Sequence, residues 1–563
     1  MADVINAAPV QEKSRGEEIV ALLNQLRGER STLDAHCVEI AERILPRDRY
    51  AFFNQTPTEG DKRTDKILDA SAAKGLERFG AVMENLLTPR GSTWHRLRSN
   101  YPDLRRNMRV QQWFDDVTAI LFAQRYSSRA TFATVQQESY LSMGAYGTGQ
   151  YRIEKPREKG ERGLRYGAIH LGGIFYLLDY QGRIRTALRV FKLSAVEAVR
   201  MFASDGNLDK LPPNLIAEFK KPVGKRSERK DWEFCHAVMP NENIQPGALD
   251  HRAMQFTSEY VAVEGKLVVE TGGYRTWPFP INRYVTAPGE TYGRSPGMLA
   301  LPAIKTLNEE KRIILKQGHR AVDPITLVHD DGIMDATDLR PGSIITGGVS
   351  AAGQKLVHEF GNQGRVDVGI ELMNLERKDI DDIFLVTLFQ ILTDNPQMTA
   401  TEVIERVREK GTLLAPTAGR QQSECLGVCI ERELDLLAQQ GMLPPMPPEL
   451  IEAGGVYQVE YEGPLARMMK AEEVSGLTRL ISIVMPYVEA TQDPTPLLHI
   501  NMEAAMPDIA WANSVPSRWL HDEDAVAAIK AGLNQQAAAQ QAVAAAPALT
   551  GLIKAAGPTP GAK

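Results

Sequence analysis

The hydrophobic pattern of this chain changes its period twice, and this constrains the fold more than any other feature. Up to about residue 145, apolar residues recur at the i, i+3, i+4, i+7 spacing of an amphipathic helix. From about Gly147 to Tyr284 they come in short β-branched and aromatic runs between turn residues, as in strands. The helical spacing returns at Ser295. A chain of 563 residues with this pattern is predicted to be a mixed α+β protein of about three or four folding units.

The apolar positions predict core faces rather than chemistry. A short helix is expected at Ser194–Ala203, and Glu264-Gly265 is expected to form the tight turn of a hairpin. The helical stripes are Ile19, Leu22, Leu23 and Leu26; Cys37, Ile40, Ala41 and Ile44; Phe79, Val82, Met83 and Leu86; and Val110, Trp113, Phe114, Val117, Ile120 and Leu121. The predicted strands are Gln150–Glu154, Ile174–Leu178, Ile184–Val190, Glu233–Met239 and Phe256–Val263.

Charge and cysteine content narrow the classes of function. Lys and Arg number 65 against 71 Asp and Glu, a formal charge of −6, so the chain lacks the basic surplus of tight nucleic-acid binders. Four cysteines are too few for disulfide bonds to stabilise a fold of this size, which favours a reducing compartment. The N-terminal segment lacks the apolar region of a secretory signal, and the longest apolar run, Ile383–Leu392, is about half of what a membrane span needs. We expect a soluble chain made inside the cell.

Two long helices of unlike charge are predicted in the second half. The first, Pro296–Arg320, begins with a proline at its first position, where the missing N–H is harmless, and Pro302 should kink it or delay its start. The second is Val366–Leu392, and a glycine-rich patch of strand and turn, Asp323–Arg365, separates the two. The first helix carries the cations Lys305, Lys311, Arg312 and Lys316, and the second carries the acids Glu376, Asp379, Asp381 and Asp382. Complementary charge suits helices packed side by side.

Further helices are expected towards the C-terminal end. Asp394-Asn395-Pro396 should break the second long helix, and another begins at Thr399. Gly411 and Pro416 should kink that helix before it continues over Ala418–Gln440. The residues after about 532 are rich in Ala, Gln, Pro and Gly without an apolar period, which is typical of disorder or a fraying helix.

Motifs that resemble catalytic or phosphate sites have simpler structural explanations. Gly293–Gly297 matches G-x-S-x-G, but Pro296 follows the serine and has no N–H for an oxyanion hole, so Ser295 is predicted to be a helix N-cap. Gly144–Gly149 is glycine-rich, but it follows a helix and leads into a strand, unlike a phosphate loop. No catalytic residue is assigned.

Candidate metal ligands are equally unconvincing. Cys425 and Cys429 share a helix face, but two ligands are too few for zinc, and buried apolar roles are favoured. Asp379, Asp381 and Asp382 lack the glycine-containing loop of a calcium site. His236 lies among apolar strand residues and is predicted to be a core histidine. We therefore expect no metal, no cofactor and no enzymatic activity, and the chain is interpreted as part of an assembly.

A set of short phrases, in a fixed order over about residues 15–525, carries a family resemblance. The phrases are IAERILP (Ile40–Pro46), LLTPRGSTWHRL (Leu86–Leu97), MGAYGTGQ (Met143–Gln150), HAVMPN (His236–Asn241), GGYRTWPFPIN (Gly272–Asn282), YGRSPGMLALPAIKTLN (Tyr292–Asn308) and MTATEVIE (Met398–Glu405), with Arg420 and Glu424 after them. Together they resemble the portal proteins, or head-to-tail connectors, of short-tailed bacteriophages (podoviruses).

The resemblance implies a portal fold, mainly helical, with named parts. These would be a wing at 1–292 (helical over 15–145, β-rich over 147–292), a first stem helix at 293–322, an α/β clip at 323–365, a second stem helix at 366–392, a tunnel loop and long kinked wing helix at 393–480, a helical crown at 481–530 and a low-complexity tail at 531–563. The candidate tunnel loop is Asp394, Asn395, Pro396, Gln397 and Met398.

The resemblance also implies a function and partners. Copies of the chain, usually twelve, would form a ring at one capsid vertex of the virion, made in the bacterial host cytoplasm. The ring would conduct double-stranded DNA, bound weakly and without specificity, during packaging and ejection. Implied partners are the terminase large subunit, the major capsid and scaffolding proteins, and the tail adaptor or nozzle proteins, with no membrane. A ring of twelve copies at −6 each would carry about −72 and repel the duplex from its wall.

Two questions stay open at the level of sequence. The cations of the first long helix are candidates for the channel wall, but pairing with the acidic helix of the same or an adjacent subunit is favoured. A tail or adaptor structural protein is the alternative function, and an intracellular enzyme with a cryptic site is the remaining one.

Overall fold

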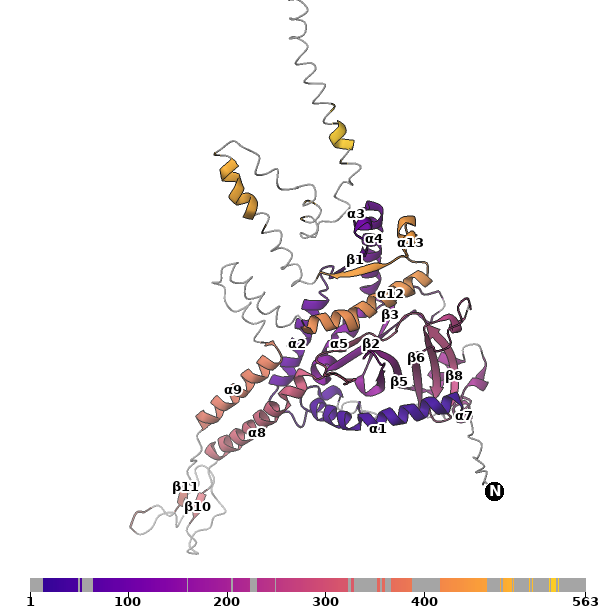
Figure 1. Ribbon diagram of the computed structural model, residues 1–563. Coiled ribbons are helices and arrows are strands. Elements are labelled where there is room, and N and C mark those ends of the chain that lie inside the picture. Colours follow the sequence, from indigo (N-terminus) through magenta and orange to yellow (C-terminus); the bar gives the residue numbers. More distant parts are fainter. Residues whose placement is uncertain are drawn as a thin grey trace, which may run out of the picture. The chain divides into compact units, whose positions relative to one another are not determined.

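The computed structural model describes residues 14–48, 51–52, 64–158, 160–203, 206–222, 230–248, 250–322, 326–328, 352–354, 357–359, 366–386 and 416–462, with scattered positions between 476 and 535. The chain divides into two compact units. One comprises Met1–Ser92 and Leu121–Met442, and the other comprises Thr93–Ile120 and Leu443–Lys563. Helices and sheets both contribute, as the change of hydrophobic period predicts for an α+β protein (Figure 1).

Helix α1 (Arg15–Ala41) opens the larger unit and covers one face of its main sheet (Figure 1). It begins with a capping box, in which the Ser14 side chain accepts from the Glu17 N–H and the Glu17 side chain accepts from the Ser14 N–H. The predicted stripe is buried, since Ile19, Leu23 and Leu26 pack against alternate residues of the sheet in one apolar cluster. The stripe runs on to Ile44, which is buried beyond the end of the helix, and the short 3₁₀ turn η1 (Pro46–Asp48) follows.

The main sheet is an antiparallel meander in the order β4-β5-β6-β7-β8. Its strands are β4 (Ile174–Leu178), β5 (Ile184–Ser194), β6 (Asp231–Pro240), β7 (Phe256–Ala262) and β8 (Leu267–Tyr274), which confirms the predicted strands to within a few residues. The last hairpin differs in its turn. Four residues, Val263 to Lys266, form the turn, and Lys266 rather than Gly265 takes a positive φ of 50°.

Short helices lie between these strands. Helix α6 (Ala195–Phe202) confirms the predicted insertion, and Ser194 caps it through a second capping box with Glu197. Helix α7 (Pro213–Phe219) follows, and both pack on the sheet face opposite α1 through Phe202 and Leu215. The 3₁₀ turns η2 (Leu171–Gly173), η3 (Leu208–Lys210) and η4 (His251–Ala253) complete the connections.

A second sheet has the order β3-β2-β9, formed by β2 (Thr148–Glu154), β3 (Arg165–Ile169) and β9 (Ile281–Arg283). Helix α5 (Phe132–Tyr146) leads directly into β2. The joint is Gly147, whose φ of 80° ends the helix in the left-handed conformation that glycine adopts without strain. The glycine-rich stretch is thus a helix C-cap, as the sequence predicts. Helix α2 (Ser71–Leu87) packs on α5 and ends just before Pro89.

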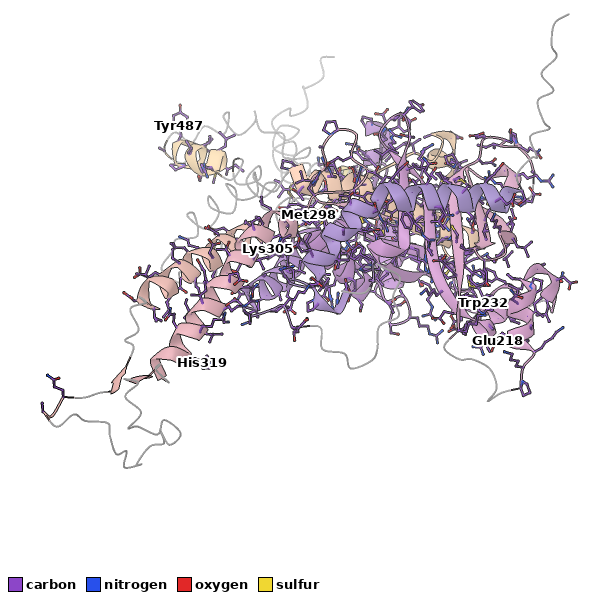
Figure 2. All side chains as sticks on the ribbon, turned by 90° about the horizontal axis from the view of Figure 1, so that it is seen from below. Glu218, Trp232, Met298, Lys305, His319 and Tyr487 are labelled. Atoms are coloured by element: carbon purple, nitrogen blue, oxygen red, sulfur yellow. The ribbon has the colours of Figure 1, made fainter. Side chains whose placement is uncertain are left out.

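Two long helices extend side by side from this unit (Figures 1 and 2). Helix α8 spans Pro296–Val322 and begins at Pro296, so Pro302 lies inside the helix and does not delay its start. Helix α9 spans Val366–Ile383. At the end away from the main sheet, strands β10 (Thr326–Val328) and β11 (Val357–Glu359) pair in antiparallel fashion, as expected for a patch containing strands.

Helix α9 is shorter than predicted. Its first segment ends at Ile383, because the chain turns there with Leu385 at a φ of 62°. Val386 is helical again, and the predicted remainder, residues 387–392, lies outside the described residues. The turn buries Phe384 completely, and its ring lies against Gly75 of α2. Burial of this aromatic side chain outweighs continued helix, a tertiary effect that periodicity does not reveal.

The predicted kinked helix is described only in part. Residues 416–421 are helical, a π-helical turn occupies Gln422–Leu426, and α12 runs over Gly427–Gln439. This confirms the expected helix over Ala418–Gln440 and adds a π-helical turn that the sequence does not predict. The candidate tunnel loop Asp394–Met398, the predicted break at Asp394-Asn395-Pro396 and the helix start at Thr399 lie outside the described residues. The predicted kink region Gly411–Pro416 does too, except for Pro416.

The smaller unit contains strands that the sequence does not predict. Its elements are β1 (His95–Ser99), α3 (Pro102–Arg106), α13 (Pro448–Glu452), β12 (Tyr457–Tyr461) and the first part of α4 (Met108–Arg125). Strands β1 and β12 pair in antiparallel fashion, with Leu97 opposite Val459. The expectation that everything up to residue 145 is helical is therefore wrong at β1, where a partner distant in sequence completes a two-stranded sheet.

Candidate functional site

The root of α8 is fixed by close backbone contacts between glycines. A Cβ atom added at Gly293 would lie 2.1 Å from the carbonyl oxygen of Gly147, so neither position accepts a larger residue without a shift of backbone. The Gly293 N–H donates to Thr148 Oγ1 at 2.8 Å. The two-helix projection therefore starts from a rigid joint between α5, β2 and the segment before α8.

Ser295 is the N-cap of α8, as predicted. Its Oγ accepts from the Met298 N–H at 2.8 Å and donates to the Ala145 carbonyl at 2.8 Å, and the residue is buried. Both partners are backbone groups, and both bonds serve the root of the helix. Within the part of the chain that the structure describes, no base is bonded to this hydroxyl to activate it as a nucleophile.

Two cations of α8, Lys305 (labelled in Figure 2) and Arg312, pair with residues outside α9. Lys305 Nζ lies 2.5 Å from Glu39 Oε1 of α1, and Arg312 Nη1 lies 2.8 Å from Glu309, one turn back on the same helix. Lys316 is exposed near the outer part of α8. The expected pairing with the acidic helix of the same chain is thus wrong for Lys305 and Arg312.

Asp69, just before α2, links the two long helices. One of its oxygens, Oδ2, lies 3.2 Å from Lys311 Nζ of α8 and 2.8 Å from Arg377 Nη2 of α9. Its other oxygen accepts from the N–H and hydroxyl of Ser71. Although burial opposes ionisation, these bonds hold the pKa of Asp69 well below its ordinary value. Lys311 therefore also pairs with Asp69 and not with an acid of α9.

The acids of α9 differ in their surroundings. Asp379 and Asp382 are exposed, while Glu376 and Asp381 are half-buried. Burial raises the pKa of Asp381, and the nearby charges of Arg78 and Asp382 act in opposite directions on it. Across the helix pair, burial and the charge of Glu376 raise the pKa of Glu310, whose Oε2 is buried and has no hydrogen-bond partner among the described residues. The contact between α8 and α9 thus includes two like charges.

Both long helices expose large apolar side chains. On α9, Val368, Leu372 and Leu375 follow the i, i+4, i+7 spacing of one helix face, and Leu375 is 61% exposed. Asp379 and Asp382 continue the same face. The exposed apolar residues of the pair are Leu299, Ile313, Leu315, Val368, Ile370, Leu372 and Leu375. We call this set the α8–α9 apolar surface.

Two residues of the family resemblance, Arg420 and Glu424, bond to the segment that follows the phrase Gly272–Asn282. Arg283 of β9 forms a two-pronged ion pair with Glu424 at 2.6 and 2.7 Å, and Gln421 Nε2 donates to the Arg283 carbonyl. Arg420 donates to Thr286 at 2.6 Å. These bonds attach the π-helical turn to β9 and to the segment after it, so Arg420 and Glu424 have structural roles.

A buried ion pair attaches α12 in the same region. Arg125 Nε donates to Glu433 at 3.0 Å with both side chains fully buried, and Tyr166 and Cys429 also donate to that carboxylate. Burial raises the pKa values of Cys425, to about 12, and of Cys429. Both thiols are therefore neutral core residues, as predicted.

His236 is a core histidine, also as predicted. It is fully buried, its Nε2 lies 2.9 Å from Ser258 Oγ, and its ring stacks on Tyr260 with centroids 4.0 Å apart. Burial, with the positive charges of nearby arginines, holds its pKa well below the ordinary value.

Three contributors to the α8–α9 region were missed by sequence reasoning. Glu39 and Asp69 lie far away in sequence, and Arg377 is a cation on a helix classed as acidic. The only local signal was Asp69-Ala70-Ser71, an acceptor next to a helix start. In the described ranges, no group of three or more His, Cys, Asp or Glu residues is placed to hold a metal ion, and no helix is long and apolar enough to cross a membrane.

Comparison with known proteins decides the family. A model of the bacteriophage head to tail connecting protein family matches residues 17–520, which include both long helices and all the described sheets of the larger unit. The chain belongs to this family. Head-to-tail connectors are structural parts of the virion, so oligomerisation and association with head and tail are the activities that membership implies.

Two connectors resemble the chain over most of their length. A probable portal protein of Bordetella phage BPP-1 is 28% identical over 485 residues, which cover 84% of this chain and 82% of the relative. A portal protein of Salmonella phage epsilon15 is 23% identical over 540 residues, or 94% and 93% of the two chains. Among solved structures, a chain of the virion of a native gene transfer agent particle is 10% identical, with a TM-score of 0.36 and coverage of 73% and 85%.

Proposed function

We propose that this connector is the portal of a short-tailed bacteriophage. In this proposal about twelve copies form a ring at one capsid vertex. Double-stranded DNA passes through the ring during packaging by the terminase and during ejection, and the tail adaptor or nozzle proteins attach to it. The major capsid and scaffolding proteins surround it, and assembly takes place in the bacterial cytoplasm. Family membership and the portal relatives of two phages support this function over a tail adaptor.

The observation that carries the proposal is the α8–α9 apolar surface. Contiguous apolar residues on an exposed face usually mark an interaction site. Leu299 and Leu375 are 69% and 61% exposed, whereas many other leucines of the larger unit are buried in its core. The occupant that we propose is a second copy of the chain, with the α9 side of one copy against the α8 side of the next.

The charges of the two helices favour such a contact between copies. Ile314 lies against Gly369, and Glu310 lies near Glu376, so the helices are antiparallel with a defined register. By this register, Asp382 is level with Lys305. Leu372 is level with Ile313 by the same register. An α9 face meeting the α8 face of its neighbour at the same level would therefore bring apolar side chains together and place acids of one helix near cations of the other, in addition to the pair that Lys305 makes with Glu39.

The contact is between two different faces, which has a consequence for symmetry. Heterologous contacts of this kind generate closed rings when the rotation between copies closes. A net charge of −6 per copy, or about −72 for the ring, repels DNA phosphates and so disfavours tight binding of DNA to the channel wall. Exposed cations such as Lys316 are candidates for the few local contacts with DNA.

We assign the portal parts on the same basis. Helices α8 and α9 are proposed as the stem, and the paired strands β10 and β11 as part of the clip. The wing is proposed to comprise residues 1–292 and the helix that ends at Gln439. Residues 481–530 are proposed as the crown and 531–563 as a tail.

Residues 394–398 are proposed as the tunnel loop. Deletion of these five residues should leave rings intact and shorten the packaged genome, and unchanged genome length would move the channel constriction elsewhere.

The deciding experiment is the mass and shape of the purified chain, by mass photometry and negative-stain electron microscopy. Rings of about twelve copies of the 62.3 kDa chain would weigh about 750 kDa and show a central hole. Leu372→Ser with Leu375→Ser should reduce ring yield at least tenfold, because each exposed leucine buried between copies contributes about 1.5–3 kcal/mol. A small closed oligomer without a channel would refute the portal.

A matched control separates the surface from general loss of apolar residues. Ile451 and Val456 of the smaller unit are 60% and 43% exposed. Ile451→Ser with Val456→Ser removes comparable exposed apolar groups outside the α8–α9 apolar surface, and ring yield should stay as in the wild type. Equal loss of rings in both double variants would mean that the α8–α9 apolar surface is not the specific contact.

A further inference from the structure

A polar row crosses the main sheet between two apolar clusters. On the face opposite α1, one cluster lies under α6 and α7 and includes Trp232 (labelled in Figure 2), and another surrounds Phe279. Between them the strand register places Arg189 of β5, His236 of β6 and Tyr260 of β7 directly opposite one another. Glu270 of β8 ends the row. Directly opposite residues share a face, so these side chains gather in one place.

Two donor or acceptor atoms in this row have no partner. The Arg189 Nη1 atom is buried and makes no hydrogen bond within the described residues, and the same holds for His236 Nδ1. Buried polar atoms are almost always satisfied, and an orphan on a charged group is costly enough to require a bound water or ion. Two directly opposite residues of one row therefore each carry a buried polar atom that a ligand could satisfy.

Two more arginines approach the row. Arg157 Nη2 donates to the Tyr260 hydroxyl at 3.2 Å, and Arg152 lies close enough to repel a charge on His236. Burial and the charge of Arg152 lower the pKa of Arg189 to about 10, which means that the charged guanidinium is less stable here than in water. A bound anion would stabilise the charged form of Arg189.

The local carboxylates do not balance these cations. Arg152 Nη1 donates to Glu154 at 3.0 Å, and Arg157 lies 3.8 Å from Glu270. Arg432, which stacks on Tyr274 nearby, is paired with Asp435. Three guanidinium groups surround His236, and Arg189 is the one for which the described part of the chain supplies no ion-paired carboxylate.

We propose that this row is a binding site for one small oxyanion of the phosphate or sulfate class, with Arg189 as its main ligand and Arg152 and Arg157 beside it. Guanidinium groups match the geometry of such anions through paired N–H donors. Arg157 is 45% exposed and marks the side from which an ion enters, while the burial of Arg189 Nη1 favours a free ion over the phosphates of a duplex. This site is independent of ring formation.

Equilibrium dialysis of the full chain against radiolabelled inorganic phosphate tests the proposal. About one phosphate should bind per wild-type chain, and Arg189→Met should weaken binding at least tenfold. Arg183→Met is the matched control, because Arg183 lies in the hairpin before the same strand and is exposed. It should bind as the wild type does. Wild-type binding by Arg189→Met, or no binding by any chain, would overturn the site.

Further measurements control for misfolding and for the source of the phosphate. Circular dichroism and thermal unfolding establish that Arg189→Met is folded, and Arg157→Met provides a second variant on the exposed side of the site, with an expected intermediate loss of binding. Addition of a short DNA duplex to the dialysis distinguishes a free ion from a nucleic-acid phosphate. A duplex that displaces the label at stoichiometric concentration would show that the row takes nucleic-acid phosphates, which contradicts a site for a free ion.

Discussion

Gly147 and Gly293 lie so close together that a Cβ atom added at Gly293 would be 2.1 Å from the Gly147 carbonyl oxygen. The obstacle is backbone, which cannot rotate away as a side chain can. This contact connects the end of α5 to the root of α8, and it therefore sets the direction in which the two long helices leave the larger unit.

Gly293→Ala should lower the stability of the larger unit by about 1–3 kcal/mol or more, as overpacking does. Gly318→Ala is the control, because nothing lies within 4 Å of its added Cβ and alanine is the better helix former. That variant should gain about 0.5–1 kcal/mol. Denaturant titration of both variants measures the difference, and equal stability would contradict a tight joint.

Asp69→Asn should destabilise the chain in a pH-dependent way. The pKa of Asp69 is lower in the folded chain than its ordinary 3.8, so the ionised group stabilises the fold at neutral pH. The variant should be about 1–3 kcal/mol less stable than the wild type at pH 7, since two cations lose their acceptor. As pH falls below about 4 the difference should shrink. A difference independent of pH would rule out a role for the charge.

Glu310→Gln should show the opposite sign. Burial and the charge of Glu376 raise the pKa of Glu310, so the folded chain binds this proton more tightly than the unfolded chain does. The variant should melt about 1–2 °C above the wild type at pH 7. The advantage should disappear as acid protonates Glu310. Thermal melts between pH 4 and 7 provide the comparison, and a variant that melts lower at pH 7 would show that Glu310 is favourably paired.

The buried pair Arg125–Glu433 should behave unlike a surface ion pair. Arg125→Met alone leaves an uncompensated carboxylate beside Tyr166 and Cys429, at an expected cost of about 3–5 kcal/mol. Arg125→Met with Glu433→Leu removes both charges and should cost less than the single variant. A double-mutant cycle measures the coupling between the two residues, and simple additivity would mean that they stabilise the fold independently.

Reversal of the exposed charges on α9 should impair assembly. Asp379→Lys with Asp382→Lys places cations level with Lys305 of a neighbouring copy, and the yield of rings should fall, most clearly at low salt. Asp381 is left unchanged, because it is half-buried near Arg78 and its loss would perturb the chain itself. Ring yield measured by mass photometry across salt concentrations is the readout. Normal yield at all concentrations would exclude an electrostatic contact through this face.

Local signals in the sequence predict local structure well here. Ser295 and Ser194 mark helix starts because their side chains accept from the first turn, and Pro296 fits the first position of α8. Alternation and β-branched residues define β4 to β7. The helical stripes indicate which faces are buried, as Leu23 and Phe79 confirm.

Contacts between distant segments could not be predicted. Strand β1 has no strong propensity of its own and forms by pairing with β12. The end of α9 depends on burial of Phe384 against Gly75, and the partners of Lys305 and Lys311 come from the N-terminal region. Opposite charges on two helices predict that the helices attract each other. They do not predict that a residue from elsewhere, Asp69, pairs with a cation of each helix.

The pairing of β1 with β12 also sets an order of events during synthesis. Arg105, just after β1, bonds Gln458 of β12 across 353 residues of sequence. At ~5–20 residues per second, a ribosome needs roughly 20–70 s to make that length. During this interval the edge of β1 has no strand to pair with, so nascent chains are exposed to wrong pairing with one another. The two-stranded sheet of the smaller unit can therefore form only after translation has passed Tyr461.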